Sequence, residues 1–379
     1  MLNKMSIRYK IETVMQGDSG TDAGWLGAGL SVVAGLFGIG VWLRREAYAK
    51  GWLKKERLDC LVVSVGNLTL GGTGKTPATI YLARRIQAYG YRVVVVTRGY
   101  KGSAEETGGV ASNGKDVVMA ASECGDEAYM MARTLGNIPV MVGRDRYAMG
   151  SLAMQKFNPQ VILLDDAFQH IRLERDIDIV LLDAEKPFGN EKLFPRGVLR
   201  EEKGALHRAG AVVLTRAEQD PGDTLKNVEQ YAPGKPIFQC KHRPYIAGIV
   251  PANAGSSIAP QATVARPGLD SLKGRCGYFF SGIARNEGFK ENMEKAGVQA
   301  CGTSFFADHH WYSLDELKGI MQSAAKKGAE MIITTEKDFV RIPQNVSWPL
   351  DLAVVGVEIQ VPDDAFDEYI RRELARKIK

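Results

Sequence analysis

Glycine, lysine and threonine are grouped in one short segment, LTLGGTGKTP, in a pattern suited to binding phosphate groups. The segment follows an apolar, β-branched run from Leu61 to Asn67 and precedes a stretch with helical apolar spacing. A glycine-rich turn between a strand and a helix presents backbone N–H groups and the positive helix end to an anion. Lys75 is then placed to reach the β- and γ-phosphates of a nucleoside triphosphate, and the Thr76 hydroxyl to ligate Mg²⁺. The nucleotide-binding residues predicted from this pattern are Thr69, Leu70, Gly71, Gly72, Thr73, Gly74, Lys75 and Thr76.

The loop departs from the strict pattern G-x-x-x-x-G-K-[ST] at its first position, which is Thr69. Gly71, Gly72 and Gly74 compensate, since they keep the loop glycine-rich. Some ATPases that act as membrane switches carry an additional lysine that reaches across a dimer, and Leu70 stands at that position here. The loop therefore predicts an ATP site and argues against a dimeric regulatory ATPase.

Two carboxylates, Asp165 and Asp166, end another apolar run, VILLDD. Carboxylates at a strand end beside the phosphate loop can hold Mg²⁺ or its waters. Ordinary polar residues at a strand end are the alternative interpretation. The Mg²⁺ ligands that we expect are Thr76, Glu127, Asp165 and Asp166.

The elements that would position these residues alternate between strands and helices. Buried strands are predicted at LVVSVGN, YRVVVVTRGY, IPVMVG, VILLDD, DIDIVLLDA and AVVLTR, with helical stretches between several of them. Such alternation predicts a parallel sheet covered on both faces, with ligands beyond the carboxyl ends of the strands. A loop rich in Ala, Gly, Ser and Pro, from Pro251 to Gly268, precedes a smaller strand–helix series. The predicted fold class is α/β, with a P-loop NTPase-type parallel sheet domain at 58–240 and a smaller α/β C-terminal domain at 241–379.

The N-terminal region contains a run without charged residues, from Ala23 to Leu43. At about 1.5 Å per residue, a helix of this length is about long enough to cross the roughly 30 Å of a hydrocarbon core. Basic residues follow the run, and the positive-inside rule then places the body of the chain in the cytoplasm. We expect an N-terminal tail at 1–22 and a membrane-associated helix with a basic linker at 23–57. A buried or interfacial helix is the alternative, and the sequence leaves open whether the helix spans the membrane or lies in it.

Length and composition set broad limits. The chain has 379 residues, which suits two domains, and its net charge of +5 does not indicate nucleic acid. We therefore expect no nucleic-acid partner, and we predict no protein partner. The cysteines are scattered without a CxxC pair, so we expect free thiols rather than a zinc site or a disulfide framework. They are Cys60, Cys124, Cys240, Cys276 and Cys301.

Together the motifs resemble those of the tetraacyldisaccharide 4'-kinases, the lipid A kinases of Gram-negative bacteria. The resemblance runs from about Trp42 to about Pro343 and rests on the order of VGNLTLGGTGKTP, VTRGYKG, CGDEAYMMA, VGRDR, DDAFQH-x-RL-x-RD, FPRGVLRE, FADHHWY and TTEKD. It implies transfer of the γ-phosphate of ATP to the 4'-hydroxyl of an acylated glucosamine disaccharide 1-phosphate. It also implies action at the cytoplasmic face of the inner membrane, through an N-terminal hydrophobic helix.

The resemblance also assigns roles to individual residues. It implies that Asp126 takes the proton from the sugar hydroxyl and that His309 is its partner. Because these two residues lie in different predicted domains, domain closure would assemble the site and exclude water. Arg200 and Glu201 match a motif near the nucleotide, where an arginine can stabilise charge on the transferring phosphoryl group. The implied catalytic residues are Lys75, Asp126, Arg200 and His309, and Glu201 joins the nucleotide-binding set.

Several residues keep more than one interpretation. Contacts with substrate phosphate and purely structural roles are both open for Arg98, Arg144 and Arg146. Nucleotide contact and hinge structure are both open for Glu336, Lys337 and Asp338. Ala167 and Asn286 stand where the family usually has glycine and proline. The alternative function is a membrane-tethered P-loop ATPase switch without a small-molecule acceptor.

Overall fold

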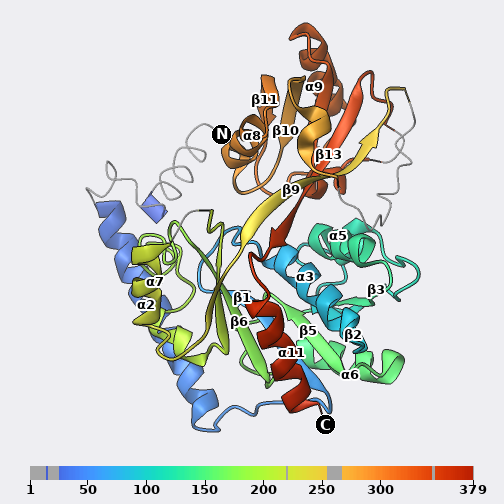
Figure 1. The fold of residues 1–379 in the computed structure, drawn as a ribbon. Helices are drawn as coiled ribbons and strands as arrows, with labels where there is room; N and C mark the ends of the chain where they lie inside the picture. Colours follow the sequence, from blue (N-terminus) through green and yellow to red (C-terminus); the bar gives the residue numbers. More distant parts are fainter. Residues whose placement is uncertain (1–13, 16–24, 219–220, 254–266, 344–345, 379) are drawn as a thin grey trace.

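The computed structural model describes residues 14–15, 25–218, 221–253, 267–343 and 346–378. Each of two units is built around its own sheet, and the smaller unit lies above the larger one in Figure 1. The tail expected at 1–22 lies almost entirely outside the described residues, as does most of the loop expected at 251–268.

The larger sheet has eight strands in the order β3-β4-β2-β5-β1-β6-β7-β8. All its pairings are parallel except that of β3 with β4. The central strands are buried along their whole length, which is typical of a sheet covered on both faces, and the predicted α/β fold is confirmed. The strands are β1 (Leu61–Asn67), β2 (Val93–Thr97), β3 (Gly109–Ser112), β4 (Val140–Val142), β5 (Val161–Asp165), β6 (Ile177–Asp183), β7 (Ala211–Thr215) and β8 (Ile237–Gln239).

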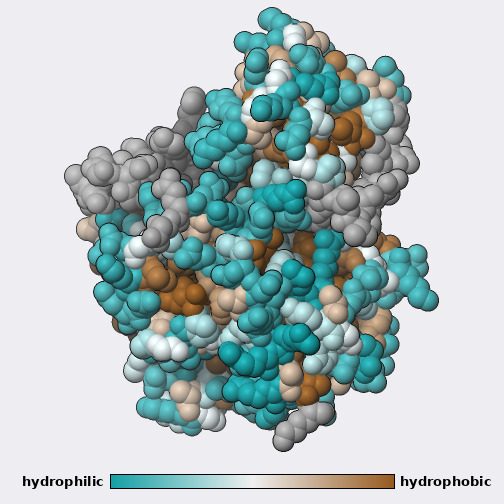
Figure 2. Space-filling model, viewed as in Figure 1, coloured by the Kyte–Doolittle hydropathy of each residue, from teal (hydrophilic) through white to brown (hydrophobic). Residues whose placement is uncertain are grey.

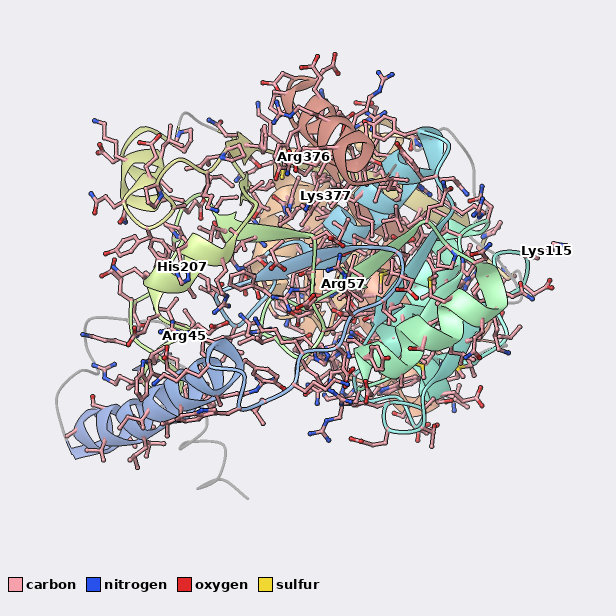
Figure 3. The ribbon with its side chains drawn as sticks, turned by 90° about the horizontal axis from the view of Figure 1, so that it is seen from below. Arg45, Arg57, Lys115, His207, Arg376 and Lys377 are labelled. Atoms are coloured by element: carbon pink, nitrogen blue, oxygen red, sulfur yellow. A yellow bond between two sulfur atoms is a disulfide. The ribbon has the colours of Figure 1, made fainter. Side chains whose placement is uncertain are left out.

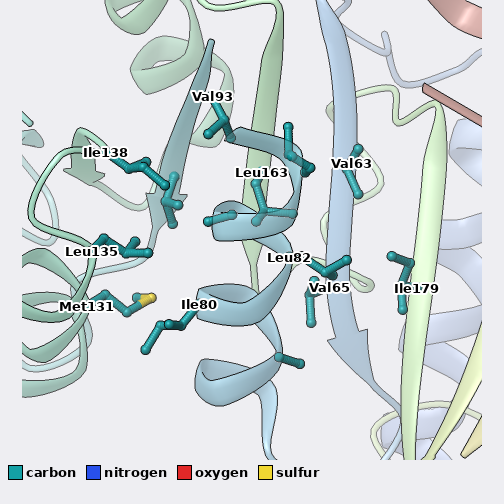
Figure 4. Close-up of a cluster of buried hydrophobic side chains, with 14 of the residues drawn as sticks. Val63, Val65, Ile80, Leu82, Val93, Met131, Leu135, Ile138, Leu163 and Ile179 are labelled. Carbon is teal, nitrogen blue, oxygen red and sulfur yellow. The ribbon is translucent and has the colours of Figure 1, made fainter. Parts of the chain in front are cut away.

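Alternate side chains of the central strands enter different hydrophobic clusters, because successive residues of a strand point to opposite faces. Val63 and Val65 of β1 pack with Ile80 and Leu82 of α3, as Figure 4 shows, whereas Val62 packs in a cluster on the other face. This core fixes the end of β1 and the start of α3, where the glycine-rich loop lies. The helices of this unit are α3 (Lys75–Ala88), α4 (Ala121–Cys124), α5 (Asp126–Leu135), α6 (Arg146–Phe157), η1 (Lys203–Arg208), α7 (Gly222–Glu229) and α11 (Ala365–Lys377).

The smaller sheet has five strands in the order β11-β10-β12-β13-β9, of which only β9 runs antiparallel to its neighbour. They are β9 (Lys241–Val250), β10 (Cys276–Ser281), β11 (Gln299–Phe305), β12 (Met331–Thr335) and β13 (Asp351–Gln360). The helices of this unit are η2 (Leu269–Leu272), α8 (Asn286–Lys295), α9 (Leu314–Lys326) and α10 (Glu336–Phe339).

The strands β9 and β13 connect the two units as a long antiparallel pair, visible at the centre of Figure 1. After β13 the chain returns to the larger unit, where Phe366 and Ile370 of α11 join the core beside α3. Asp367 of α11 also forms an ion pair with Arg85 of α3, with 2.9 Å between Nε and Oδ2. The predicted C-terminal domain, 241–379, included α11, which the structure instead packs on the larger unit. Local sequence patterns do not show which unit a terminal amphipathic helix packs against.

The apolar N-terminal segment forms α2 (Trp25–Ala49), which lies along the side of the larger unit in Figure 1. The helix is long and apolar enough to cross a membrane, and only 11% of its most apolar 18-residue stretch is buried against the rest of the protein. Leu36, Phe37 and Ile39 are exposed, and Phe37 also contacts the ring of Phe194. Figure 2 shows brown hydrophobic surface over the region in which Figure 1 places α2 and α7. Figure 3 labels Arg45 on α2 and Arg57 on the basic linker that follows.

Two cysteines are paired, contrary to the expectation of five free thiols. Cys276 of β10 and Cys301 of β11 form a disulfide, with their Cα atoms 5.7 Å apart. The sequence carries no signal for this pair, because adjacent parallel strands bring together residues from distant parts of the chain. Cys60, Cys124 and Cys240 are free.

Candidate active site

A cleft of about 2120 Å³ lies between the two units. The glycine-rich loop and the start of α3, residues 70–77, line it from the larger unit. His309 and residues 335–337 line it from the smaller unit. The predicted phosphate loop therefore faces residues that are more than 200 positions further along the chain.

The glycine-rich loop has the geometry of a phosphate cradle. Gly71 and Gly74 have φ angles of 107° and 82°, a region that L side chains rarely adopt. At Gly71 and Gly72 an added Cβ would meet open space, which leaves room for a ligand at the backbone. The loop is held by Leu70 N–H to Val198 O, 2.7 Å, and by Asn67 Nδ2 to Thr73 Oγ1, 2.9 Å. The first turn of α3 has no side-chain cap, so its N–H groups are available to an anion.

Lys75, Asp166 and Arg200 form a charged group directly beside the loop. The Nζ of Lys75 lies 3.8 Å from Oδ1 of Asp166, and NH1 of Arg200 donates to the same oxygen at 2.8 Å. Burial lowers the pKa of Lys75, while Asp166 acts in the opposite direction. Burial alone would raise the pKa of Asp166, but Lys75 and Arg200 hold it below its usual value. The two cations therefore share one carboxylate and retain a net positive charge for a phosphate.

Asp165 is held differently, although it is the neighbour of Asp166. Its Oδ1 accepts a hydrogen bond from Thr79 Oγ1 at 2.8 Å, and its Oδ2 accepts one from Thr97 Oγ1 at 3.2 Å. Burial raises the pKa of Asp165 to about 6, with further contributions from the negative charges of Glu127 and Asp166.

The four residues predicted as Mg²⁺ ligands, Thr76, Glu127, Asp165 and Asp166, all line the cleft. Glu127, however, is paired with Lys337, and Asp166 is already neutralised. In the described part of the chain, no group of three or more His, Cys, Asp or Glu side chains is arranged to hold a metal ion. Mg²⁺ in phosphoryl-transfer sites usually keeps several waters and needs one or two protein oxygens beside the phosphates. Thr76 and Asp165 fit that requirement.

Glu201, predicted to bind the nucleotide, lines the cleft but is engaged by another residue. Its two carboxylate oxygens accept from NH1 and NH2 of Arg208 at 2.8 and 2.9 Å. This bidentate pair is nearly buried, so it fixes the segment that carries Arg200.

Asp126 and His309 are in direct contact across the two units, as the resemblance implied. The Nδ1 of His309 donates to Oδ2 of Asp126 at 2.8 Å. His309 lines the cleft, whereas the Asp126 side chain behind it is only 6% exposed. Because Nδ1 carries the proton shared with Asp126, Nε2 is left as the acceptor nitrogen. The φ of His309 is 63°, an unfavourable value that its N–H to Gly282 O bond, 3.1 Å, helps to maintain.

Arg341, which the sequence interpretation missed, completes this cluster. Its Nε donates to Oδ2 of Asp126 at 2.6 Å, and its NH1 donates to Gly282 O at 2.8 Å. Burial alone would raise the pKa of Asp126, but His309 and Arg341 hold it well below its usual range. The available signal was an arginine three residues after Asp338 in TTEKDFVR, one helical turn further along.

The residues of the TTEKD motif contact protein groups of both units. Lys337 pairs with Glu127, and Glu336 accepts from Thr134 Oγ1 at 3.4 Å, so both reach α5 of the larger unit. Asp338 is fully buried and accepts from Gly282 N at 2.8 Å.

The three arginines with open interpretations also line the cleft. Arg98 and Arg144 form ion pairs with Glu105 and Glu106. Arg146 is buried, which lowers its pKa to about 10, and its NH1 donates to Gly143 O at 2.8 Å.

The two departures from the family pattern are accommodated by the surrounding structure. Ala167 is fully buried, and its N–H donates to Val65 O at 3.2 Å. Asn286 accepts from Ser281 Oγ at 2.7 Å and donates to Phe306 O at 2.9 Å.

A phosphate loop at the end of a central parallel strand and an imidazole facing it across a cleft define the class of P-loop α/β phosphotransferases. A family model described as tetraacyldisaccharide-1-P 4'-kinase (LpxK) matches residues 26–375. The chain therefore belongs to the tetraacyldisaccharide-1-P 4'-kinase family, which confirms the resemblance found in its sequence motifs.

Individual relatives and a solved structure agree with this assignment. The tetraacyldisaccharide 4'-kinase of Desulfatibacillum aliphaticivorans is 38% identical over 370 residues, which covers 97% of this chain and 98% of that protein. The tetraacyldisaccharide 4'-kinase of Geobacter sulfurreducens is 38% identical over 348 residues, 92% of this chain and 93% of that protein. A crystal structure of LpxK from Aquifex aeolicus, described as an "apo" form in complex with ATP, matches with a TM-score of 0.71 at 29% identity. It covers 92% of this chain and 99% of that chain.

Proposed function

We propose that this protein transfers the γ-phosphate of ATP to the 4'-hydroxyl of an acylated glucosamine disaccharide 1-phosphate, a step of lipid A biosynthesis. The observation that carries the proposal is the position of His309, which faces the phosphate loop from the opposite wall of one cleft. The names of the relatives supply the identity of the acceptor. A switch ATPase, the alternative from sequence, has no need of such an imidazole.

The larger unit would bind the nucleotide. Backbone N–H groups of the loop and of the first turn of α3 would hold the phosphates, with Lys75 reaching the β- and γ-phosphates. Arg200 and Lys75 together would stabilise the charge that develops on the transferring group. Mg²⁺, held by the Thr76 hydroxyl and by Asp165 directly or through water, would neutralise phosphate charge.

The smaller unit would supply the proton acceptor. Nε2 of His309 would take the proton of the 4'-hydroxyl as the oxygen attacks, and Asp126 would orient the ring and stabilise the imidazolium that forms. The resemblance gave these two roles in the opposite order. Two observations favour His309: it faces the cleft, and the lowered pKa makes the Asp126 carboxylate a weak base.

The N-terminal helix would bring the enzyme to its lipid substrate. The exposed apolar surface of α2, with Leu36, Ile39 and Leu43, suits contact with acyl chains. Arg44 and Arg45 follow the apolar run, and from the positive-inside rule we infer that the body of the chain would lie on the cytoplasmic face of the inner membrane.

The proposal is tested by incubating the protein with γ-labelled ATP, Mg²⁺ and the acylated disaccharide 1-phosphate in detergent micelles. We expect label in the lipid product. His309→Ala should reduce transfer about 10²- to 10⁴-fold while ATP binding stays within about threefold. The matched control is His207→Ala, which alters an exposed histidine of η1 and should leave transfer unchanged. Label that appears only as free phosphate would overturn the kinase proposal.

A further inference from the structure

The buried side chain of Arg341 touches both residues assigned to proton transfer, Asp126 and His309. It follows α10 in the smaller unit, and its side chain is fully buried. Nε and NH2 both contact Oδ2 of Asp126, and NH2 lies 3.4 Å from Nδ1 of His309. The guanidinium therefore lies against the atoms that form the Asp126–His309 hydrogen bond.

Groups of the smaller unit hold one side of the Arg341 guanidinium, and Asp126 of the larger unit contacts the other side. NH1 donates to Gly282 O at 2.8 Å and lies 3.3 Å from Oδ1 of Asp338. Asp338 Oδ1 also accepts from Tyr312 Oη at 2.9 Å, so this anchor is itself hydrogen-bonded. All three guanidinium nitrogens thus have partners, as a buried cation requires. The planar fork of arginine reaches both units at once, which the single ammonium of lysine does not reproduce.

Contacts beside Arg341 join α10 of the smaller unit to α5 of the larger unit. Lys337 of α10 pairs with Glu127, the residue next to Asp126 on α5, and Glu336 accepts from Thr134 at the end of α5. Three side chains from one short segment therefore bind one face of α5. Because Asp126 and His309 belong to different units, their hydrogen bond forms only when the smaller unit lies against α5.

We propose that Arg341 is a positioning residue for the reaction: it orients Asp126, and through Asp126 the ring of His309, and with Lys337 it latches the smaller unit onto α5. This inference rests on the proposed function, because it assigns His309 the task of accepting the substrate proton. The sequence left the role of the TTEKD segment undecided. On this proposal the segment holds Asp126 and His309 together, and it does not need to contact the nucleotide.

The latch has a consequence for the pH dependence of transfer. The charged and titratable groups facing His309 from the elements around it are Asp126, Asp308, Arg341, Tyr100 and the Glu127–Lys337 pair next to Asp126. Removal of the Arg341 charge favours the protonated imidazole, which is the inactive form of a base. Arg341→Met should therefore move the midpoint of the acid limb of kcat to higher pH by about one unit. A purely structural arginine would lower kcat at all pH values without moving that limb.

The experiment measures transfer to the acylated disaccharide 1-phosphate against pH for wild type, Arg341→Met and Arg341→Lys. Arg341→Lys keeps the charge and loses the fork, so we expect a tenfold or larger fall in kcat with the limb in place. KM for ATP should stay within about twofold in both variants. Arg275→Met, which removes an arginine from a surface ion pair with Glu330, is the matched control and should resemble wild type.

Each outcome decides the inference. An unmoved acid limb in folded Arg341→Met would overturn it. If circular dichroism shows that Arg341→Met is unfolded, the decision falls on Arg341→Lys, and a wild-type kcat there would overturn it. Failure of the proposed function has a separate signature, since the wild-type protein itself would then give no labelled lipid.

Discussion

The two walls of the cleft are built in different ways. The nucleotide wall comes from one continuous segment, in which β1, the glycine-rich loop and the start of α3 follow each other. The opposite wall combines Asp126 with His309 and Arg341, which lie 183 and 215 positions away in the chain. The first wall is complete once one strand and one helix have formed, whereas the second exists only when two units are in register. We therefore expect nucleotide binding and phosphate transfer to depend on different parts of the structure.

The largest expected effect tests the local wall alone. Lys75→Met should lower kcat about 10³-fold, because a buried cation at the phosphates is lost, while the melting temperature changes little. Steady-state transfer assays and thermal melts measure the two quantities. Lys115→Met, at a residue that is labelled in Figure 3, is the control for loss of a lysine charge. A loss below tenfold would show that the loop does not position the transferring phosphate.

A second prediction concerns the cost of burying the Asp165 carboxylate of β5 beside the nucleotide wall, where Thr79 of α3 donates to it. The pKa of Asp165 is raised from 3.8 to about 6 by burial, so folding favours its protonated form. The contribution of protonated Asp165 to the free energy of unfolding is complete below about pH 4, and it is lost as the pH rises to about 6. Asp165→Asn does not titrate and should gain stability relative to wild type across this window, by up to about 3 kcal/mol.

The measurement is chemical denaturation of both proteins at pH 4 and pH 7, before any nucleotide is added. A difference between the two proteins that is the same at both pH values would contradict the raised pKa. The Asp165→Asn variant should also transfer phosphate more slowly, as expected of a buried carboxylate that lowers stability but serves the reaction.

The smallest expected effect tests the long-range wall. Lys337→Met removes the partner of Glu127 from an ion pair whose side chains are 34% and 33% exposed. Because solvent screens such a pair, we expect a fall in kcat of about three- to tenfold with an unchanged KM for ATP. Assays at low and high salt should show the difference between wild type and variant shrinking as salt rises. Lys318→Met, from an exposed pair on α9, is the control. A change in KM for ATP with kcat intact would assign Lys337 to the nucleotide instead.

The sequence predicted the local wall from physical patterns, since a buried strand, a glycine-rich turn and a helix are all readable within one window. Asp165 and Asp166 were predicted in the same way, from their place at the end of an apolar run, and both line the cleft. Asp126 and His309 were named only by resemblance to a family, because no local pattern distinguishes them from ordinary polar residues. Arg341 gave no signal that was used, and its burial depends on carboxylates from two units. The Cys276–Cys301 pair and the return of α11 were missed for the same reason: tertiary contacts decide them.

The pairing of β9 with β13 gives the smaller unit the topology of an insertion. The chain leaves the larger unit after β8 and re-enters it at α11, and the two crossing points, Lys241 and Gln360, are register partners on adjacent strands. Entry and exit therefore lie side by side, at a spacing that a short hairpin turn spans. The larger unit is therefore topologically complete without the smaller unit, which is inserted at a single point between β8 and α11. In such an architecture the sequence of the inserted smaller unit can change while the larger unit keeps its phosphate loop. A change in the smaller unit can then change which hydroxyl is phosphorylated.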